Sequence, residues 1–310
     1  MMRFVSPLCP LILIVASLLP LHASGWWGFG HMVVAEIARR NLDEKIMRTL
    51  ENYTQHLSMS GPFPEIPDFV QSACWPDDLK GYNLRVMNGW HFTDNIYIRG
   101  NFTPENITKQ KSNVVSVIDS LSNTLKRTDT PIYVRSFALA HLVHYYGDIH
   151  QPLHTTSMMS NDFPHGDLGG NLIRVSFRGH HMNLHALWDS ICQGEQKQLK
   201  RPLSPESYAK VISFADRLVA TYNFSREEKE LTSPAAISKE GYALAKAVAY
   251  KNVEDNTILN ESYIENCVKT AEERVTLAGY RLATQLTKIF KRKRKSSKGH
   301  RDDSIYASPL

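Results

Sequence analysis

Apolar residues recur every three or four positions along most of this chain, which is the spacing of amphipathic helices. This spacing predicts helices over His31–Asn41, Leu42–Tyr53, Pro104–Lys126, Ile132–Ile149, Leu184–Cys192, Pro205–Tyr222, Ile237–Tyr250 and Ser262–Phe290. The alternation typical of strands is scarce, and Asn171–Phe177 is the best candidate for a short strand or hairpin. The sequence contains no internal repeat and no interdomain linker before its C-terminal tail. The pattern therefore predicts a mostly α-helical fold in a single domain.

The first 25 residues have the pattern of a secretory signal. Arg3 precedes an apolar run, Leu11–Leu19, that is too short to span a bilayer comfortably, and small residues follow at 23–25. Cleavage after Gly25 would make Trp26 the new amino terminus; an uncleaved membrane anchor is the alternative. Because no later segment is apolar for long enough to cross a membrane, we expect a secreted protein or one in the lumen of the secretory or endolysosomal pathway.

Charge separates the chain into a near-neutral body and a basic tail. Of the net charge of +5, residues 1–25 carry +1 and residues 291–310 carry +5, which leaves −1 for the predicted domain, residues 26–290. The tail begins KRKRK and is predicted to be disordered. It could attract polyanions, or it could be a solvated end without a specific partner.

Cysteines and sequons agree with export. The cysteines that remain after signal removal are Cys74, Cys192 and Cys267. Three is an odd number, so at most one disulfide bond is expected, and the sequence does not choose its pair. The sequons, which predict a glycoprotein, are at Asn52, Asn101, Asn106, Asn223 and Asn260.

The most informative stretch is ALAHLVHYYGDIHQPLH, residues 138–154. His144 and Asp148 stand four residues apart, so a helix places them on one face, and His154 follows just after Pro152, where the helix cannot continue. The neighbouring residues are mostly apolar, which predicts a largely buried helix. Buried polar side chains need partners because leaving them unpaired is costly.

A second stretch, HHMNLHALWDS, repeats the pattern. His185 and Asp189 are again four residues apart on an apolar segment. Two helices that each present a histidine and a carboxylate resemble the metal sites of helical bundles. A single buried histidine is usually structural, but two such pairs with His154 between them predict a metal site. Nitrogen and carboxylate ligands without thiolate suit zinc, with manganese or iron as weaker candidates.

Two further motifs contain polar residues that could be ligands, next to aromatic or other apolar residues. WPDDLK places Asp77 and Asp78 after a proline, with Lys80 close behind, although an adjacent acidic pair is more often a cap or a solvated turn. GWHFTDN places His91 between two aromatic residues and Asp94 three residues later.

The motif WWGFGH places His31 five residues after Trp26. If Trp26 is the free terminus, its amino nitrogen and carbonyl oxygen can chelate a metal ion. An intact signal would then block the site.

Together these motifs resemble the zinc-dependent type I nucleases: fungal single-strand-specific nucleases, plant bifunctional endonucleases and protozoan 3′-nucleotidase/nucleases. The resemblance covers residues 26–290 in the same order. It is carried by WWGFGH, CWPDDLK, WHFTD, HYYGDIHQPLH, GDLGGN, NLHALWD and AEERVTLAGYRLATQL. It implies the helical fold that these nucleases share with zinc phospholipase C, with a short β-hairpin.

The resemblance implies three zinc ions per chain. The first would bind Asp77, His91, His144 and a bridging Asp148. The second would bind His154, His185 and Asp189. The third would bind the amino nitrogen and carbonyl oxygen of Trp26, His31 and the same Asp148. Of the two neighbouring carboxylates at 77 and 78, the family pattern selects Asp77.

The resemblance also implies the reaction and its substrates. Asp77 would orient the attacking water and Lys80 would stabilise the developing charge, while Asp94 and Asn171 would hydrogen-bond the edge of a nucleobase. Cleavage of the 3′ P–O bond of RNA, DNA or 3′-nucleotides would leave 5′-phosphate products, or nucleosides and phosphate. Single-stranded nucleic acid would be preferred, because a duplex phosphate does not easily reach a deep cleft. A monomer is the default expectation.

Two other functions are compatible with parts of this pattern. A zinc phospholipase C has a related site, but its final ligand is a glutamate where this chain has Asp189, and its metal-binding histidine lies further from the terminal tryptophan. A non-enzymatic extracellular zinc- or nucleic-acid-binding protein would be expected to have lost ligands, and the sequence retains all of them. The nuclease is therefore favoured.

Overall fold

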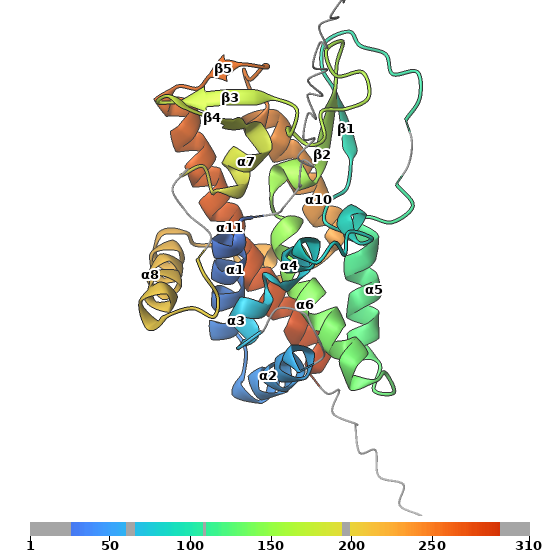
Figure 1. The fold of residues 1–310 in the computed structure, drawn as a ribbon, viewed down its shortest axis with the longest axis vertical. Coiled ribbons are helices and arrows are strands. Elements are labelled where there is room, and N and C mark those ends of the chain that lie inside the picture. Colours follow the sequence, from blue (N-terminus) through green and yellow to red (C-terminus); the bar gives the residue numbers. More distant parts are fainter. Residues whose placement is uncertain (1–25, 60–65, 108–109, 194–198, 292–310) are drawn as a thin grey trace, which may run out of the picture.

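Helices dominate the structure, a computed structural model that describes residues 26–59, 66–107, 110–193 and 199–291. The α-helices of these residues are α1 (Gly28–Arg40), α2 (Glu44–Ser58), α3 (Phe69–Ser72), α4 (Trp75–Gly81), α5 (Val114–Lys126), α6 (Ile132–Asp148), α7 (Leu184–Asp189), α8 (Pro205–Thr221), α9 (Arg226–Glu230), α10 (Pro234–Leu244) and α11 (Glu261–Phe290). The shorter helical segments are η1 (Asn88–Trp90), η2 (Pro152–His154) and the π-helical η3 (Ala245–Ala249). The strands are β1 (Asn95–Ile98), β2 (Thr156–Met159), β3 (Arg174–Phe177), β4 (His180–Asn183) and β5 (Thr257–Ile258). The predicted mostly α-helical class is confirmed (Figure 1). The predicted signal and residues 292–310 of the predicted tail lie outside the described residues.

Side-chain caps explain where many helices begin. The Asp43 carboxylate accepts a hydrogen bond from Ile46 N at 2.8 Å and starts α2. Asn113 does the same for Ser116 N at 3.1 Å and starts α5. Such caps satisfy backbone N–H groups that the first helical turn leaves unpaired, and each contributes about 1 kcal/mol.

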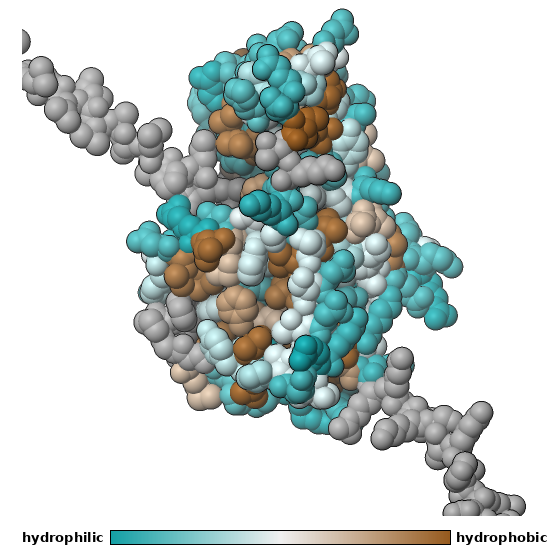
Figure 2. Space-filling model, turned by 90° about the vertical axis from the view of Figure 1, so that its right-hand side faces the viewer, coloured by the Kyte–Doolittle hydropathy of each residue, from teal (hydrophilic) through white to brown (hydrophobic). Residues whose placement is uncertain are grey.

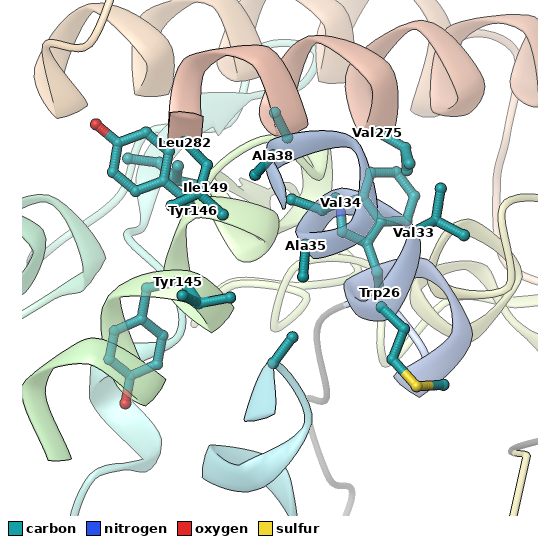
Figure 3. Packing of buried hydrophobic residues seen from close by; sticks show 14 of the residues in the cluster. Trp26, Val33, Val34, Ala35, Ala38, Tyr145, Tyr146, Ile149, Val275 and Leu282 are labelled. Carbon is teal, nitrogen blue, oxygen red and sulfur yellow. The ribbon is translucent and has the colours of Figure 1, made fainter. Parts of the chain in front are cut away.

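The core forms where α1, α6 and α11 pack against one another. Helix α6 is buried on all sides from Ala138 to Asp148, as α1 is from Phe29 to Ala38, whereas α2 and α5 bury only one face. Figure 3 shows α1 and α6 side by side below α11, with Val275 of α11 near Val33 of α1 and Leu282 of α11 near Tyr146 of α6. Each fully buried aliphatic side chain of this size contributes about 1.5–3 kcal/mol. The helix that carries the first histidine–aspartate pair is therefore held at the centre of the core.

The strands form two small sheets. Strands β1 and β2 pair in parallel, with Asn95 opposite Thr156. Strand β3 pairs with β4 as an antiparallel hairpin and with β5 in parallel. The hairpin turn has positive φ at Arg178 and Gly179, as a two-residue turn between twisted strands requires. The predicted strand or hairpin at 171–177 is thus present from residue 174 onward.

The predicted helix Pro104–Lys126 is wrong in its first ten residues. The structure begins this helix at Val114, and residues 104–113 have no helical structure where they are described. Ile107 is 54% exposed, so this part of the segment has no apolar surface to bury its face against. The Asn113 side chain also caps α5 by accepting a hydrogen bond from Ser116 N, which favours a helix that begins at Val114 rather than earlier.

A disulfide bond joins Cys192, just after α7, to Cys267 of α11, and Cys74 is a buried free thiol. The bond ties the end of the second histidine–aspartate helix to the longest helix of the fold.

Among the described residues, none of the helices combines the length and apolar character needed to span a bilayer. On the face shown in Figure 2, hydrophobic side chains occur in separate patches between hydrophilic ones.

Candidate metal centre

The centre is built around the last turn of α6. His144 and Asp148 lie one turn apart on this helix, and His144 Nε2 is 3.2 Å from Asp148 Oδ2. The other ring nitrogen, His144 Nδ1, is 2.7 Å from the carbonyl oxygen of Ala73. Because a carbonyl only accepts, this contact assigns the proton to Nδ1. The Nε2 lone pair of His144 therefore points into the site.

Asp148 is completely buried and contacts histidines from three other parts of the chain. Its Oδ2 is 2.9 Å from His91 Nδ1, and its Oδ1 is 3.3 Å from His31 Nε2 and 3.9 Å from His154 Nδ1. Burial alone would favour a protonated carboxyl, but the neighbouring His144 and His154 hold the pKa of Asp148 well below its usual range. The centre thus keeps one permanent negative charge shared among several imidazoles.

His31 reaches this carboxylate from α1. Its ring stacks on that of His144 with centroids 3.9 Å apart, and the fit requires Gly147, where an added Cβ would come within 2.6 Å of His31 Nδ1. Burial, followed by the effect of His144, lowers the pKa of His31 to about 4. The imidazole is therefore neutral at pH 7, the form that binds metal ions.

Asp77 and Lys80 flank the same cluster from α4. Lys80 Nζ is 2.6 Å from Asp77 Oδ1, which lies 3.8 Å from His91 Nδ1 and 3.7 Å from His144 Nε2. Burial opposes ionisation of Asp77, but Lys80 and then His144 lower its pKa. Burial and Lys80 also lower the pKa of His91 to about 4.

His154, His185 and Asp189 form a second cluster. His154 Nδ1 is 2.8 Å from the carbonyl of His91, and His185 Nδ1 is 2.7 Å from that of Gly169, so both Nε2 atoms face inward, 3.1 Å apart. Asp189 Oδ2 is 3.4 Å from His185 Nε2, and its Oδ1 is 3.8 Å from His154 Nε2. Burial raises the pKa of Asp189 well above its usual value.

The donor atoms of both clusters fit metal ions. Three groups each place their ligand atoms within 4.8 Å of one another: His31/His144/Asp148, Asp77/His91/His144 and His154/His185/Asp189. Nitrogen ligands at about 2.0–2.1 Å in a tetrahedron would be about 3.3 Å apart, close to the 3.1 Å between the two Nε2 atoms of the second cluster. His31 Nε2 and Asp148 Oδ1, buried and facing each other, have no hydrogen-bond partner among the described residues. A cation between such atoms would satisfy both.

Trp26 lies beside both clusters. Its indole Nε1 donates to the carbonyl of Gly147 at 2.9 Å, directly before Asp148. The next amide, Trp27 N, donates to the carbonyl of Asp189 at 2.9 Å. The start of the described chain is thus held between the residues that carry the two clusters, with the Trp26 side chain buried (Figure 3).

Comparison with known proteins assigns this arrangement to a family. The family model described as S1/P1 nuclease matches residues 26–291. The chain belongs to the S1/P1 nuclease family. This family has the helical fold of the zinc phospholipases C, in agreement with the structure.

Individual relatives cover nearly the same part of the chain. The chain is 28% identical to Endonuclease 3 of Arabidopsis thaliana over 87% of its own length and 90% of the plant protein. It is 25% identical to Nuclease S1 of Aspergillus oryzae, over 86% of the chain and 92% of the relative. Nuclease P1 of Penicillium citrinum is 23% identical, over 85% of the chain and 97% of the relative.

In this S1/P1 nuclease family member, the two predicted base-contacting residues lie on neighbouring segments. Asp94 directly precedes β1, which pairs with β2, and Asp167 N donates to the β2 carbonyl of Met158 at 2.9 Å. Asn171 is buried in the loop after Asp167, and its Nδ2 donates to the carbonyl of Leu168 at 2.8 Å. The structure gives Asp94 and Asn171 no direct contact; the loop of Asp167 connects them.

Partial loss of hydration, followed by the Asp167 carboxylate, raises the pKa of Asp94 to about 6, although the side chain stays exposed at one side. Because the carboxyl pKa is higher in the folded protein than in the unfolded chain, folding stability falls as pH rises from the unfolded pKa to about 6.

We therefore expect Asp94→Asn to melt at a higher temperature than wild type above pH 6, with the difference vanishing near pH 4. Solvent screening should keep the gain in unfolding free energy within about 1 kcal/mol, which corresponds to a rise in melting temperature of about 2–4 °C. Thermal unfolding of chelator-treated protein between pH 4 and 7 measures it.

Asp162→Asn, on an exposed loop, is the matched control for this pH series. A stability difference for Asp94→Asn that is the same at pH 4 and pH 7 would contradict the assignment. A difference that grows toward low pH would do so as well.

Sequence reasoning missed several supporting residues of the site. Gln151 Nε2 donates to Asp189 Oδ1 at 2.8 Å. Asp167 accepts from the amides of Gly169 and Gly170 at 3.1 and 2.9 Å, which shapes the loop whose Gly169 carbonyl orients His185. An aspartate two residues before a Gly-Gly pair is a recognisable turn signal, so Asp167 could have been found from the sequence.

The second acidic residue of WPDDLK has a separate partner. Both oxygens of Asp78 accept hydrogen bonds from Arg201, at 2.6 and 2.5 Å. The structure therefore directs Asp77 into the cluster and Asp78 to a paired arginine distant in sequence. No local pattern predicts that pair.

Proposed function

We propose that this protein is a zinc-dependent nuclease that hydrolyses the 3′ P–O bond of single-stranded RNA and DNA and of 3′-nucleotides. The products would be 5′-phosphate ends or, from 3′-nucleotides, nucleosides and phosphate. The observation that carries the proposal is one buried carboxylate, Asp148, shared by imidazoles of different helices beside the Asp77–Lys80 pair. Structural zinc sites are usually closed four-ligand sets, whereas a shared carboxylate suits a multinuclear catalytic site.

Three zinc ions per chain would be held by nine residues. They are Trp26, His31, Asp77, His91, His144, Asp148, His154, His185 and Asp189. When bound, the ions would acidify water and neutralise the charge of the reacting phosphate. The neutral imidazoles of His31 and His91 and the ionised Asp148 provide the ligand forms that such binding needs.

The Asp77–Lys80 pair would act directly on the reaction. Asp77 is kept ionised and is fixed by its 2.6 Å contact with Lys80, so its carboxylate can accept a hydrogen bond from the attacking water and orient it. Lys80 is only 5% exposed, and its ammonium would stabilise the negative charge that develops on the phosphate. Both groups are positioned before substrate arrives.

Asp94 and Asn171 would hold the base next to the scissile phosphate. A carboxylate and an amide can hydrogen-bond the edges of several bases, which supports tolerance of many sequences. The predicted domain carries almost no net charge. Substrate phosphate would therefore be attracted by the local cations of the site.

We further propose that the protein is processed after Gly25, exported through the secretory pathway, glycosylated, and monomeric, with a basic tail that contacts polyanions. Processing would free the amino group of Trp26 for metal binding. The exposed positions of Asn101 and Asn223 support their glycosylation. Mass spectrometry of the secreted protein, with and without glycosidase, would test both modifications.

The proposed function is tested by zinc content and cleavage on the same processed protein. We expect three zinc ions per chain and release of 5′-phosphate products from single-stranded RNA and DNA. Chelator should abolish the activity and added zinc should restore it. Bound zinc with hydrolysis of phosphatidylcholine, but not of nucleic acid, would replace the nuclease by a phospholipase C. Bound zinc with neither activity would indicate a binding protein, and absence of zinc would overturn the metal assignment.

A further inference from the structure

Aromatic rings and cationic side chains gather where β1 lies beside α10 and η3. Lys246 Nζ is 5.3 Å from the ring centroid of Tyr97 and 5.5 Å from that of Tyr242. The guanidinium carbon of Arg99 is 5.8 Å from the Tyr97 ring centre. We call Tyr97, Arg99, Tyr242 and Lys246 the β1–η3 patch.

The patch is held in place by backbone contacts. Arg99 donates from its two Nη atoms to the carbonyls of Val253 and Tyr250, at 2.5 and 2.6 Å. The Tyr242 hydroxyl donates to the carbonyl of Ile96 at 3.4 Å. Within the described ranges, neither Arg99 nor Lys246 forms a salt bridge with a carboxylate. Two positive charges are therefore available to an anion beside rings of fixed orientation.

The patch continues from the candidate metal centre. Strand β1 starts at Asn95, immediately after Asp94, and Thr93 N donates to the carbonyl of His154 at 2.8 Å. Tyr97 is three residues beyond Asp94, which along an extended strand is about 10 Å. Each nucleotide of a stacked strand advances about 3.4 Å along the strand axis, and further when the strand is extended. The patch thus lies within a few nucleotides of the site that would hold the base next to the scissile phosphate.

The chemistry of the patch matches single-stranded nucleic acid. Proteins that bind single strands without sequence preference combine cations for the phosphates with aromatic rings on which bases stack. An ammonium over a ring marks an electron-rich face, and a base can take the same place while the flexible Lys246 turns to a phosphate. Lys246 also lies in a π-helical segment, a rare element that is frequently found at functional sites.

We propose that the β1–η3 patch binds nucleotides adjacent to the cleaved linkage of a single-stranded substrate, an inference that rests on the proposed nuclease function. Tyr97 supplies a stacking surface and the exposed Lys246 binds a phosphate, while the charge of Arg99, whose Nη atoms donate to backbone carbonyls, adds to the attraction. A 3′-nucleotide is too short to reach the patch. The patch therefore affects oligonucleotides and leaves the mononucleotide reaction unchanged.

The test compares a single-stranded DNA 12-mer with a 3′-nucleotide in zinc-loaded enzyme. Tyr97→Ala should raise KM for the 12-mer roughly 5- to 160-fold, the range expected for loss of one stacked base, while Tyr97→Phe should keep the wild-type value. Lys246→Ala should reduce the salt dependence of 12-mer binding by about 0.7 in log–log slope. The 3′-nucleotide KM should not change in any variant. Lys45→Ala is the matched control, because Lys45 is exposed on α2, at the opposite end of the molecule from β1 (Figure 1).

The proposal would be overturned if the Tyr97 and Lys246 alanine variants changed KM equally for the 12-mer and the 3′-nucleotide, or changed KM for neither. Wild-type cleavage of the 3′-nucleotide reports on the proposed function alone, so the two hypotheses fail separately. If wild type cleaves neither substrate, fluorescence anisotropy with the labelled 12-mer still tests the patch. Tighter binding by wild type than by Lys246→Ala supports it, and equal binding overturns it.

Discussion

Replacement of Asp148 with alanine is expected to lower nuclease activity by at least about 1,000-fold and to remove most of the bound zinc. Asp148 is the one carboxylate within 4.0 Å of His31, His91, His144 and His154 in the described structure. Without it the site loses the negative charge at its centre and the only ligand shared between two of the proposed ions. Metal ions contribute several kcal/mol of charge stabilisation, and each 1.36 kcal/mol corresponds to a tenfold change in rate.

Zinc content by mass spectrometry and cleavage of single-stranded DNA would be measured on the same sample. Asp119→Ala, which removes an exposed carboxylate from α5, is the control and should behave as wild type. Circular dichroism separates loss of ligands from loss of folding. His185→Ala provides a second variant, because His185 belongs only to the second cluster; it should abolish activity while losing about one zinc ion. Wild-type turnover in either site variant would refute the metal assignment.

Addition of one glycine ahead of Trp26 in the processed chain is expected to remove one zinc ion and to lower activity at least about 100-fold. A peptide bond turns the basic amino nitrogen into an amide, which is a poor metal ligand at neutral pH. The surrounding contacts prevent the chain from compensating, because Trp26 Nε1 is bonded to Gly147 and Trp27 N to Asp189. Loss of one direct ligand should exceed the 10- to 100-fold effects typical of supporting groups.

The same glycine added after Leu310 is the matched control. A cleavable extension ahead of Trp26 adds a reversal test, since removing it should restore both the zinc ion and the activity. Unchanged zinc content and turnover in the extended protein would refute the role of the free terminus. Loss of activity with three zinc ions retained would place the effect elsewhere than in metal binding.

Helical periodicity was sufficient for the elements that build the centre. The apolar spacing around His144 and Asp148 predicted a buried helix, and α6 is buried on all sides from Ala138 to Asp148. The prediction failed over 104–113, where Ile107 is the single apolar side chain apart from Pro104 and remains exposed. Helix formation in proteins depends on packing of the apolar face, and a sequence pattern does not tell whether a partner surface exists.

Local spacing also predicted which residues belong to the centre. His144/Asp148 and His185/Asp189 each lie one helical turn apart, and the structure brings both pairs, with His154, into buried clusters. The roles of Asp77, Lys80, Asp94 and Asn171 came from family resemblance. Gln151 could have been inferred from its place between two predicted ligands, whereas nothing near Asp78 in the sequence points to Arg201.

The sequence by itself determined the fold class and the two histidine–aspartate pairs on helices, because these depend on neighbours within one or two helical turns. Apart from His154, the other proposed ligands and their grouping came from the family resemblance. Only the tertiary structure brings the side chains of each proposed cluster to within 4.8 Å of one another. Parallel pairing of β1 with β2 brings His91 to His154, and carbonyl groups such as that of Ala73 turn the imidazoles inward. The β1–η3 patch likewise joins residues about 150 positions apart. Such contacts depend on how whole elements pack against each other, and no local pattern of residues encodes them.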